Sequence, residues 1–213
     1  MLRNSDEKVW TIVVAGGSSQ RFGRPKQYEQ LGAVRILDWS MITAREASDG
    51  VVLVVPEADV IIEGGVAGGR SRSESVRNGL AAVPADATII CVHDAARPFA
   101  SAELYADVIN AVARGAACAV PGIEVIDTIK VVDSAGAVVS TPDRASLRAV
   151  QTPQAFRAHI LRDAHAALGE STDDAMLVES MGQLVVVVVG HADNRKITVP
   201  ADIEWARAKV GQR

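Results

Sequence analysis

The chain has 213 residues, of which 48% are hydrophobic and 4% aromatic, and its formal net charge at pH 7 is −4. This length suits one domain, and the hydrophobic share is ample for a core and excludes a disordered chain. A negative net charge excludes a protein that coats nucleic acid with a broad basic face, although it allows a small basic pocket. The few aromatic residues argue against a base-stacking platform.

Short β-branched runs alternate along the chain with longer amphipathic segments. In chain order, the predicted strands are Thr11–Ala15, Val51–Val55, Thr88–Val92, Ala116–Val120 and Val185–Val189. The predicted helices are Ile36–Ala47, Ser73–Ala82, Ala102–Arg114, Arg157–Leu168, Asp173–Met181 and Ala201–Lys209. The strand runs are continuously apolar, so we expect both faces of the sheet to be covered. The alternation predicts an α/β fold with a Rossmann-like, mostly parallel sheet flanked by helices.

The segment 124–150 breaks this rhythm. Asp127–Val132 and Ala137–Ser140 read as extended runs separated by the turn signal Asp133-Ser134-Ala135-Gly136. We therefore expect a β-hairpin arm inserted into a single domain that spans residues 1–213. Because an isolated hairpin is barely stable in water, this arm should pack on something, and a second subunit is a natural candidate.

Two cysteines, Cys91 and Cys118, each lie in an apolar run and are expected to be reduced core thiols. Their spacing is not that of a metal site. The charged start, Met1 to Lys8, is not followed by a long apolar segment, and the longest apolar stretch is far shorter than a membrane span. We therefore expect a soluble, cytoplasmic protein.

The first predicted strand runs into a small-residue loop that contains Gly16 and Gly17. Three cations follow, Arg21, Arg24 and Lys26, with no acid before Glu29. Bare backbone N–H groups after a strand can cradle phosphate, and nearby cations add charge that such a ligand needs. The loop matches neither the Walker sequence nor the dinucleotide fingerprint, and by itself it could be an ordinary tight turn.

Three further segments carry polar and charged residues at the ends of predicted elements: Gly68–Ser75, His93–Pro98 and Gly190–Thr198. Open α/β sheets bind ligands beyond the carboxyl ends of their strands, so all these segments should meet the first loop in one cleft.

Each of these residues also has a simpler interpretation. Asp94 and Arg97 could form a surface ion pair, and Asp193 and Lys196 could be solvated loop charges. Asp173 and Asp174 could serve only the start of a helix. The side chains of His93 and His191 are expected to be structural or orienting rather than catalytic.

Taken together, these segments resemble the 2-C-methyl-D-erythritol 4-phosphate cytidylyltransferases of the non-mevalonate isoprenoid pathway, from about Ile12 to about Glu204. The resemblance is carried by Ala15-Gly16-Gly17, Arg21, Pro25-Lys26-Gln27, Gly68-Gly69, Arg72, Ser75-Val76, His93-Asp94-Ala95-Ala96-Arg97-Pro98, Asp127-Thr128-Ile129-Lys130, Arg144, Gln151-Thr152-Pro153-Gln154, Thr172-Asp173-Asp174 and Asp193-Asn194 with Lys196-Ile197-Thr198. The chain departs from the family pattern at two points. Ser19 stands where the family loop usually has glycine. The spacing from Arg21 to Lys26 is shorter than expected for the family, so that Arg24 could share the role of Arg21.

The resemblance implies that CTP and 2-C-methyl-D-erythritol 4-phosphate react to give the CDP-linked alcohol and pyrophosphate. The nucleophile would be a substrate phosphate oxygen, already ionised at neutral pH, so no general base is required. This agrees with a sequence that shows no nucleophile–base arrangement.

The resemblance also implies residue roles. Arg21 and Lys26 would stabilise the transition state, and Arg144 and Lys196 would position the substrate phosphate. The remaining contacts are Asp94, Arg97, Thr128 and Thr172 for the substrate, and Ala15, Gly16, Gly17, Gly69 and Ser75 for the nucleotide. A Mg²⁺ ion held mainly by CTP phosphates is expected, without protein metal ligands. In this family the arm reaches across a homodimer, so Thr128 and Arg144 would serve the partner's active site or meet it at the interface.

Other readings remain open. A cytidylyltransferase acting on a pentitol or pentulose 5-phosphate would share the first loop and the Thr-Pro-Gln segment. A nucleotide-binding regulatory module without catalysis would not need all four of Arg21, Lys26, Arg144 and Lys196. A nicotinamide-dependent oxidoreductase is disfavoured by the missing dinucleotide fingerprint.

Overall fold

The computed structural model describes residues 7–16, 22–23, 25–167, 169–171 and 173–211. Its strands are β1 (Val9–Val14), β2 (Gln30–Leu31), β3 (Val34–Arg35), β4 (Gly50–Val55), β5 (Val66–Ala67), β6 (Ile89–Asp94), β7 (Cys118–Glu124), β8 (Val131–Val132), β9 (Val138–Ser140), β10 (Arg148–Val150), β11 (Gln154–Arg157) and β12 (Val185–Val189). Its α-helices are α1 (Ile36–Ala47), α2 (Val60–Glu63), α3 (Arg72–Ala82), α4 (Ala102–Ala113), α5 (Ala158–Ala166), α6 (Asp174–Ser180) and α7 (Pro200–Val210). The strands and helices expected from the sequence are present, with ends shifted by a few residues.

One mixed sheet forms the centre of the molecule. Strands β5, β4, β1 and β6 are parallel neighbours, β11 lies antiparallel between β6 and β7, and β12 pairs in parallel with β7. The sheet is therefore mostly parallel and confirms the predicted α/β class. Parallel order brings the carboxyl ends of β1, β4 and β6 to the same edge, where ligands of such sheets bind.

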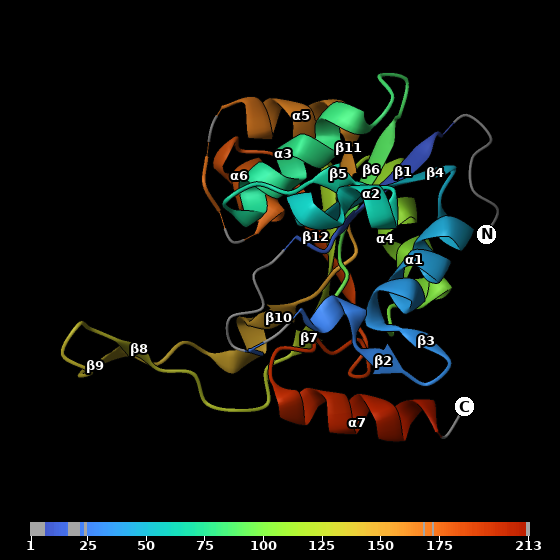
Figure 1. Ribbon diagram of the computed structural model, residues 1–213. Coiled ribbons are helices and arrows are strands. Elements are labelled where there is room, and N and C mark those ends of the chain that lie inside the picture. Colours follow the sequence, from blue (N-terminus) through green and yellow to red (C-terminus); the bar gives the residue numbers. More distant parts are fainter. Residues whose placement is uncertain (1–6, 17–21, 24, 168, 172, 212–213) are drawn as a thin grey trace.

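Helices cover both faces of this sheet (Figure 1). On one face, residues of α1 and α4 such as Leu37 and Val108 pack in a cluster with Val13 of β1. On the other face, Val76 of α3 and Leu161 of α5 pack in a second cluster with residues of β1, β4 and β6. Both faces of the central strands are thus buried, which is why their sequences are continuously apolar.

Strand β12 is the exception to this two-sided burial. It pairs with β7 at the margin of the sheet, and Val189 is 85% exposed. The expectation that its valine run is covered on both faces is wrong within this chain, because an apolar run alone does not say where in the sheet a strand will lie.

The segment of β10 and β11 was not predicted as strand. Both strands run antiparallel to β7, and the interruption between them, with a cis bond before Pro153, lies beside Pro121 of β7. Pro121 has no N–H to donate, but its carbonyl accepts from the N–H of Gln151. The strand pairing with β7 is therefore interrupted between Val150 and Ala155, within the Gln151–Gln154 motif.

The predicted hairpin arm is present as β8 and β9, and it extends away from the body of the molecule (Figure 1). Apolar side chains lie exposed on the arm and at its base: Ile126, Val131, Val132, Val138 and Val139. Cys91 and Cys118 are buried free thiols, as expected. Within the described residues, no helix has the length and apolar character needed to cross a membrane.

Candidate active site

A cleft of about 760 Å³ opens where the carboxyl ends of β1 and β6 meet the start of α3. Its walls include residues from all the segments predicted to meet: Gly16 and Lys26 from the first loop, Ser71 before α3, Ala96 after β6 and Thr198 near α7. The prediction of one shared cleft is confirmed. The segments converge because each follows a strand of the same parallel sheet or begins the helix packed beside it.

Glycines and a serine form one wall of the cleft. The Ser75 hydroxyl donates to the carbonyl of Ser71 at 2.9 Å and accepts from the N–H of Gly69 at 3.0 Å. A Cβ atom on Gly16 would lie 3.5 Å from the Cα of Gly68, so the two loops approach backbone to backbone. Ser75 thus closes the loop before α3, and the glycines leave backbone groups accessible to a ligand.

The start of α3 faces the cleft. Ser71 caps this helix by accepting a hydrogen bond from the N–H of Glu74 at 3.0 Å, and Ser71 and Arg72 both line the cleft. The unpaired N–H groups and the dipole of a helix N-terminus favour anions, so this end of the cleft suits phosphate.

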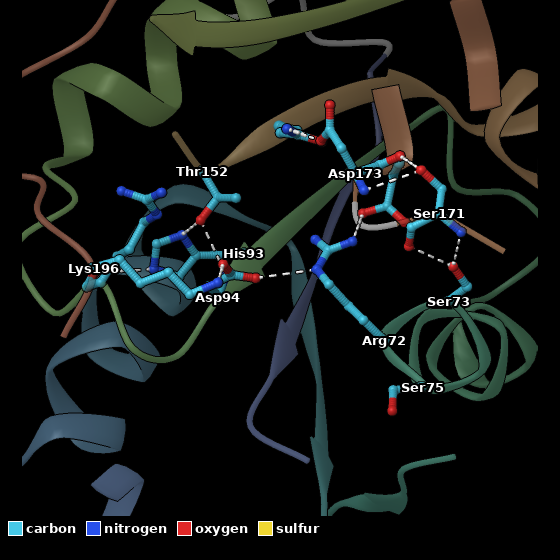
Figure 2. Close-up of polar contacts among 12 residues, drawn as sticks. Arg72, Ser73, Ser75, His93, Asp94, Thr152, Ser171, Asp173 and Lys196 are labelled. Atoms are coloured by element: carbon cyan, nitrogen blue, oxygen red, sulfur yellow. Dashed lines mark hydrogen bonds and ion pairs between the residues drawn. The ribbon is translucent and has the colours of Figure 1, made fainter. Parts of the chain in front are cut away.

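Asp94, the last residue of β6, is buried between two cations. Its Oδ2 accepts from Lys196 Nζ at 2.6 Å, and its Oδ1 lies 3.4 Å from Arg72 Nε. Figure 2 shows Arg72 and Lys196 reaching this carboxylate. Burial would raise the pKa of Asp94, but the positive charges of Arg72 and Lys196 outweigh it and hold that pKa well below its usual range. Asp94 is therefore an ionised acceptor, and its interpretation as half of a surface ion pair is wrong.

His93 has an orienting position, as the sequence suggested. Thr152 Oγ1 accepts from the N–H of Asp94 at 3.0 Å and lies 3.1 Å from His93 Nδ1, while His93 Nε2 lies 3.2 Å from the carbonyl of Arg97. The threonine proton then points to Nδ1, and Nε2–H donates to the carbonyl. Burial lowers the pKa of His93 to about 4, so the ring is neutral and ties β6 to the Thr152 segment.

Arg97 is turned toward backbone carbonyl groups. Its Nη1 donates to the carbonyl of Asn194 at 2.8 Å and its Nη2 to that of Val150 at 3.4 Å. Burial lowers its pKa. Arg97 therefore joins the end of β10 to the segment that carries Lys196.

Lys196 is held in the cleft by the backbone around it. The N–H of Ile197 donates to the carbonyl of Ala96 at 2.8 Å, which ties this segment to the end of β6. Asp193, nearby, pairs with Lys209 of α7 at 2.5 Å. The interpretation of Asp193 and Lys196 as solvated loop charges is therefore wrong for both residues.

The remaining predicted residues lie in three places. Ala15 and Lys26 line the cleft. Thr128 and Arg144 lie on the exposed arm, where Arg144 Nη1 donates to the carbonyl of Ile126 at 2.8 Å, and neither lines the cleft. The predictions for Gly17, Arg21 and Thr172, and for Ser19 and Arg24, lie outside the described residues.

Sequence reasoning missed the partners of Asp94. The sequence motif that contains Arg72 indicates no role for it, and a place at a helix start is enough to account for Asp174. In the structure Arg72 Nη1 donates to Asp174 Oδ2 at 2.6 Å, and His165 Nε2 lies 3.1 Å from Asp174 Oδ1. The cation-rich run Arg70-Ser71-Arg72 was the available signal, but nothing local indicated which acid it would meet.

Comparisons with known proteins show the family of this chain. Residues 9–212 match the family model described as 2-C-methyl-D-erythritol 4-phosphate cytidylyltransferase. An enzyme of that name from Rhodococcus jostii is 44% identical over 215 residues, covering 95% of each chain. One from Nocardia farcinica is 39% identical, covering 99% of this chain and 97% of its own.

Solved structures give the same result. 4-Diphosphocytidyl-2C-methyl-D-erythritol synthase from Anaerococcus prevotii superposes with a TM-score of 0.86 at 30% identity, covering 98% of this chain and 100% of its own. The 2-C-methyl-D-erythritol 4-phosphate cytidylyltransferase from Thermus thermophilus does so with a TM-score of 0.81 at 33% identity, covering 94% and 98%. This chain belongs to the 2-C-methyl-D-erythritol 4-phosphate cytidylyltransferase family and is a nucleotidyltransferase of isoprenoid biosynthesis.

Proposed function

We propose that the cleft transfers CMP from CTP to 2-C-methyl-D-erythritol 4-phosphate and releases pyrophosphate. The observation that carries this assignment is the gathering of Lys26, Arg72, Lys196 and the start of α3 around one glycine-walled cleft of about 760 Å³. Two polyanions must meet there, and like charges 4 Å apart cost about 4 kcal/mol for each unit pair near a protein surface. Converging cations offset this repulsion.

The nucleotide lies against the glycine wall in this proposal. Ala15, Gly16, Gly69 and Ser75 line that wall or hold it in place. Backbone N–H and C=O groups can hydrogen-bond the base and ribose only if no side chain intervenes, and the glycines provide that access. Gly17 is assigned to the same wall from the resemblance alone.

Charge develops on the leaving pyrophosphate as the bond to the α-phosphorus breaks. Lys26 lies on the cleft wall and is assigned, with Arg21, to stabilise this charge. The substrate's own phosphate oxygen attacks, and it is ionised at neutral pH, so the residues position charge rather than remove a proton. The neutral, fully buried ring of His93 is consistent with this, since its two nitrogens lie within hydrogen-bond distance of Thr152 and a backbone carbonyl.

A Mg²⁺ ion is proposed as the cofactor, held mainly by the CTP phosphates. Asp94 is the one acid among the described residues that line the cleft, and both of its oxygens already bind cations. The described residues also contain no group of three or more acids, histidines or cysteines suited to a metal. These residues fit a metal ion that keeps water and phosphate ligands. When bound, the ion would neutralise charge on the triphosphate.

The acceptor substrate lies toward Asp94 and Lys196. Lys196 is assigned to hold the substrate phosphate for in-line attack, and Asp94 to accept hydrogen bonds from substrate hydroxyl groups. Arg97 supports this end by anchoring the backbone beside Lys196, at Asn194. Thr172 is assigned to the same end from the resemblance.

Arg144 and Thr128 are assigned to the cleft of a partner subunit. We assign the whole chain to a single nucleotidyltransferase domain. The projecting arm is shorter than the predicted 124–150, because Glu124 and Arg148–Val150 pair in the central sheet. Ile126 and Val139 on the arm are 83% and 66% exposed. Exposed apolar side chains on a marginal hairpin are typical of an interface. We propose a homodimer in which each arm covers the other active site, in an enzyme that works in the cytoplasm.

The reaction is tested by pyrophosphate release. CTP, ATP, GTP and UTP are each supplied with 2-C-methyl-D-erythritol 4-phosphate, and CTP is also supplied with a pentitol 5-phosphate. We expect turnover with CTP and the methylerythritol substrate only. Preferred turnover of the pentitol phosphate would instead identify the related cytidylyltransferase.

The arm is tested by deleting residues 127–144 and closing the gap with a short glycine linker. We expect a folded monomer without activity, measured by light scattering and pyrophosphate release. A deleted protein that stays dimeric with normal turnover would contradict the assignment of Arg144 and Thr128.

A further inference from the structure

Behind the cleft, a buried ion network joins α3 to α5 and α6. Arg72, the first residue of α3, contacts Asp174, the first residue of α6, through Nη1 at 2.6 Å. The second oxygen of Asp174 lies 3.1 Å from His165 Nε2 of α5. Asp174 is 1% and His165 2% exposed. The transfer reaction as described above uses neither of these buried residues.

The two ends of the Arg72 guanidinium hold different carboxylates. Nη1 is firmly bonded to Asp174, whereas Nε lies 3.4 Å from Asp94, near the limit for a hydrogen bond. The firm contact therefore determines where the guanidinium lies, and the looser contact follows from it. A planar guanidinium spreads its donors over both ends and can bridge two separated acids in this way, whereas all three donors of a lysine ammonium lie on one nitrogen.

The charge of Arg72 is permanent. Burial alone would lower its pKa, but the negative charges of Asp94 and Asp174 outweigh burial and raise it above its ordinary value. Each oxygen of the Asp94 carboxylate thus has one cation beside it, Arg72 at Oδ1 and Lys196 at Oδ2. An ionised carboxylate has about four acceptor sites, so both oxygens of Asp94 can still accept from hydroxyl donors. The two cations hold the plane of this carboxylate in one orientation.

We propose that Asp174 and His165 are positioning residues for the acceptor substrate. They hold Arg72 against Asp94, and Arg72 together with Lys196 holds the Asp94 carboxylate in the orientation that binds the substrate hydroxyls. This inference rests on the role proposed for Asp94. It predicts a defect confined to the acceptor substrate, because among the described residues the network reaches the cleft through Arg72 and Asp94.

The test is steady-state pyrophosphate release with each substrate varied in turn. Asp174→Asn and Arg72→Lys should each raise KM for 2-C-methyl-D-erythritol 4-phosphate about tenfold or more, because each variant loses a charge-assisted contact. KM for CTP should stay within about twofold of its value in the unmodified enzyme. The double variant should be no worse than Arg72→Lys, because both changes remove the same constraint. His165→Gln should show a smaller shift in the same direction.

Arg77 provides a matched control on the same helix. Its Nη2 pairs with Glu170 at 3.0 Å, outside the cleft, so Arg77→Lys should leave both KM values unchanged. Thermal unfolding of every variant separates positioning from stability: a smaller folded fraction lowers the maximal rate but leaves KM as it was. If Asp174→Asn does not fold, Arg72→Lys carries the test.

Three results overturn parts of this account in different ways. An unchanged acceptor KM in both Asp174→Asn and Arg72→Lys would refute the positioning role. A rise in KM for CTP instead would make Arg72 a nucleotide contact. If Asp94→Asn itself leaves KM for the acceptor substrate unchanged, the proposed role of Asp94 fails, and the inference fails with it. If KM for the acceptor rises in Asp94→Asn but in neither Asp174→Asn nor Arg72→Lys, the role of Asp94 stands and only the network is refuted.

Discussion

Replacing Lys196 with glutamine removes one of the two cations beside Asp94 and keeps most of the side-chain length. In the structure Lys196 Nζ donates to Asp94 Oδ2 at 2.6 Å, and Arg72 stays in place beside Oδ1. Asp94 is buried, so losing this partner should cost about 1–3 kcal/mol of folding stability, with Arg72 still holding the carboxylate. We therefore expect Lys196→Gln to fold.

The activity should fall for a separate reason, which is the loss of a contact to the substrate phosphate. A charge-assisted hydrogen bond contributes about 1.5–3 kcal/mol, and 1.4 kcal/mol corresponds to a factor of ten, so one lost contact to the substrate phosphate predicts a decrease of about 10- to 100-fold. The decrease should appear in kcat/KM for 2-C-methyl-D-erythritol 4-phosphate. Lys196→Arg, which keeps the charge, should recover part of it.

Lys209 supplies the control for this prediction. It is a partly buried lysine of α7 whose Nζ pairs with Asp193 at 2.5 Å, and it does not line the cleft. Pyrophosphate release and thermal unfolding are measured for Lys196→Gln and Lys209→Gln side by side. If kcat/KM of Lys196→Gln stays within about twofold of the unmodified enzyme, or falls no more than in Lys209→Gln, the reasoning is refuted.

Three further predictions concern stability and the glycine wall. Burial holds the pKa of His93 at about 4 in the folded protein, against about 6.5 in the unfolded chain. The contribution of the neutral His93 ring to the free energy of unfolding is therefore complete above about pH 6.5 and is lost as the pH falls toward 4. Denaturant titrations should show up to about 3 kcal/mol lost over that range, and a smaller loss in His93→Gln; equal losses would contradict this. Thr152→Val removes the acceptor of a buried backbone N–H and should cost about 1–3 kcal/mol in the same titrations, whereas a neutral effect would argue against that network. Gly69→Ala would place a Cβ 2.1 Å from Cγ of Glu74, so the loop must shift and KM for CTP should rise about tenfold, while Gly211→Ala, with ordinary contacts at 3.6 Å, should leave it unchanged.

The main elements and the place of the site follow from local patterns in the sequence. The apolar runs and amphipathic segments depend on local spacing, and α1 begins and ends where predicted, at Ile36 and Ala47. The motifs follow strands of one parallel sheet, and such strands end at a common edge, so their convergence could be predicted without coordinates. The β8–β9 arm was predictable for the same local reason, from two extended runs and a turn.

Which charges meet depends on how distant segments pack together. Asp94 pairs with Arg72, 22 residues away, and with Lys196, 102 residues away, and the sequence offered Arg97 as a nearer partner. Arg72 likewise meets Asp174 across 102 residues. Strand β11, four residues long, was missed because so short a segment has no readable period, and its place between β6 and β7 depends on pairing at both edges. Contacts of this kind form only when distant segments pack together, because their energy lies in burial and pairing and leaves no local pattern along the chain.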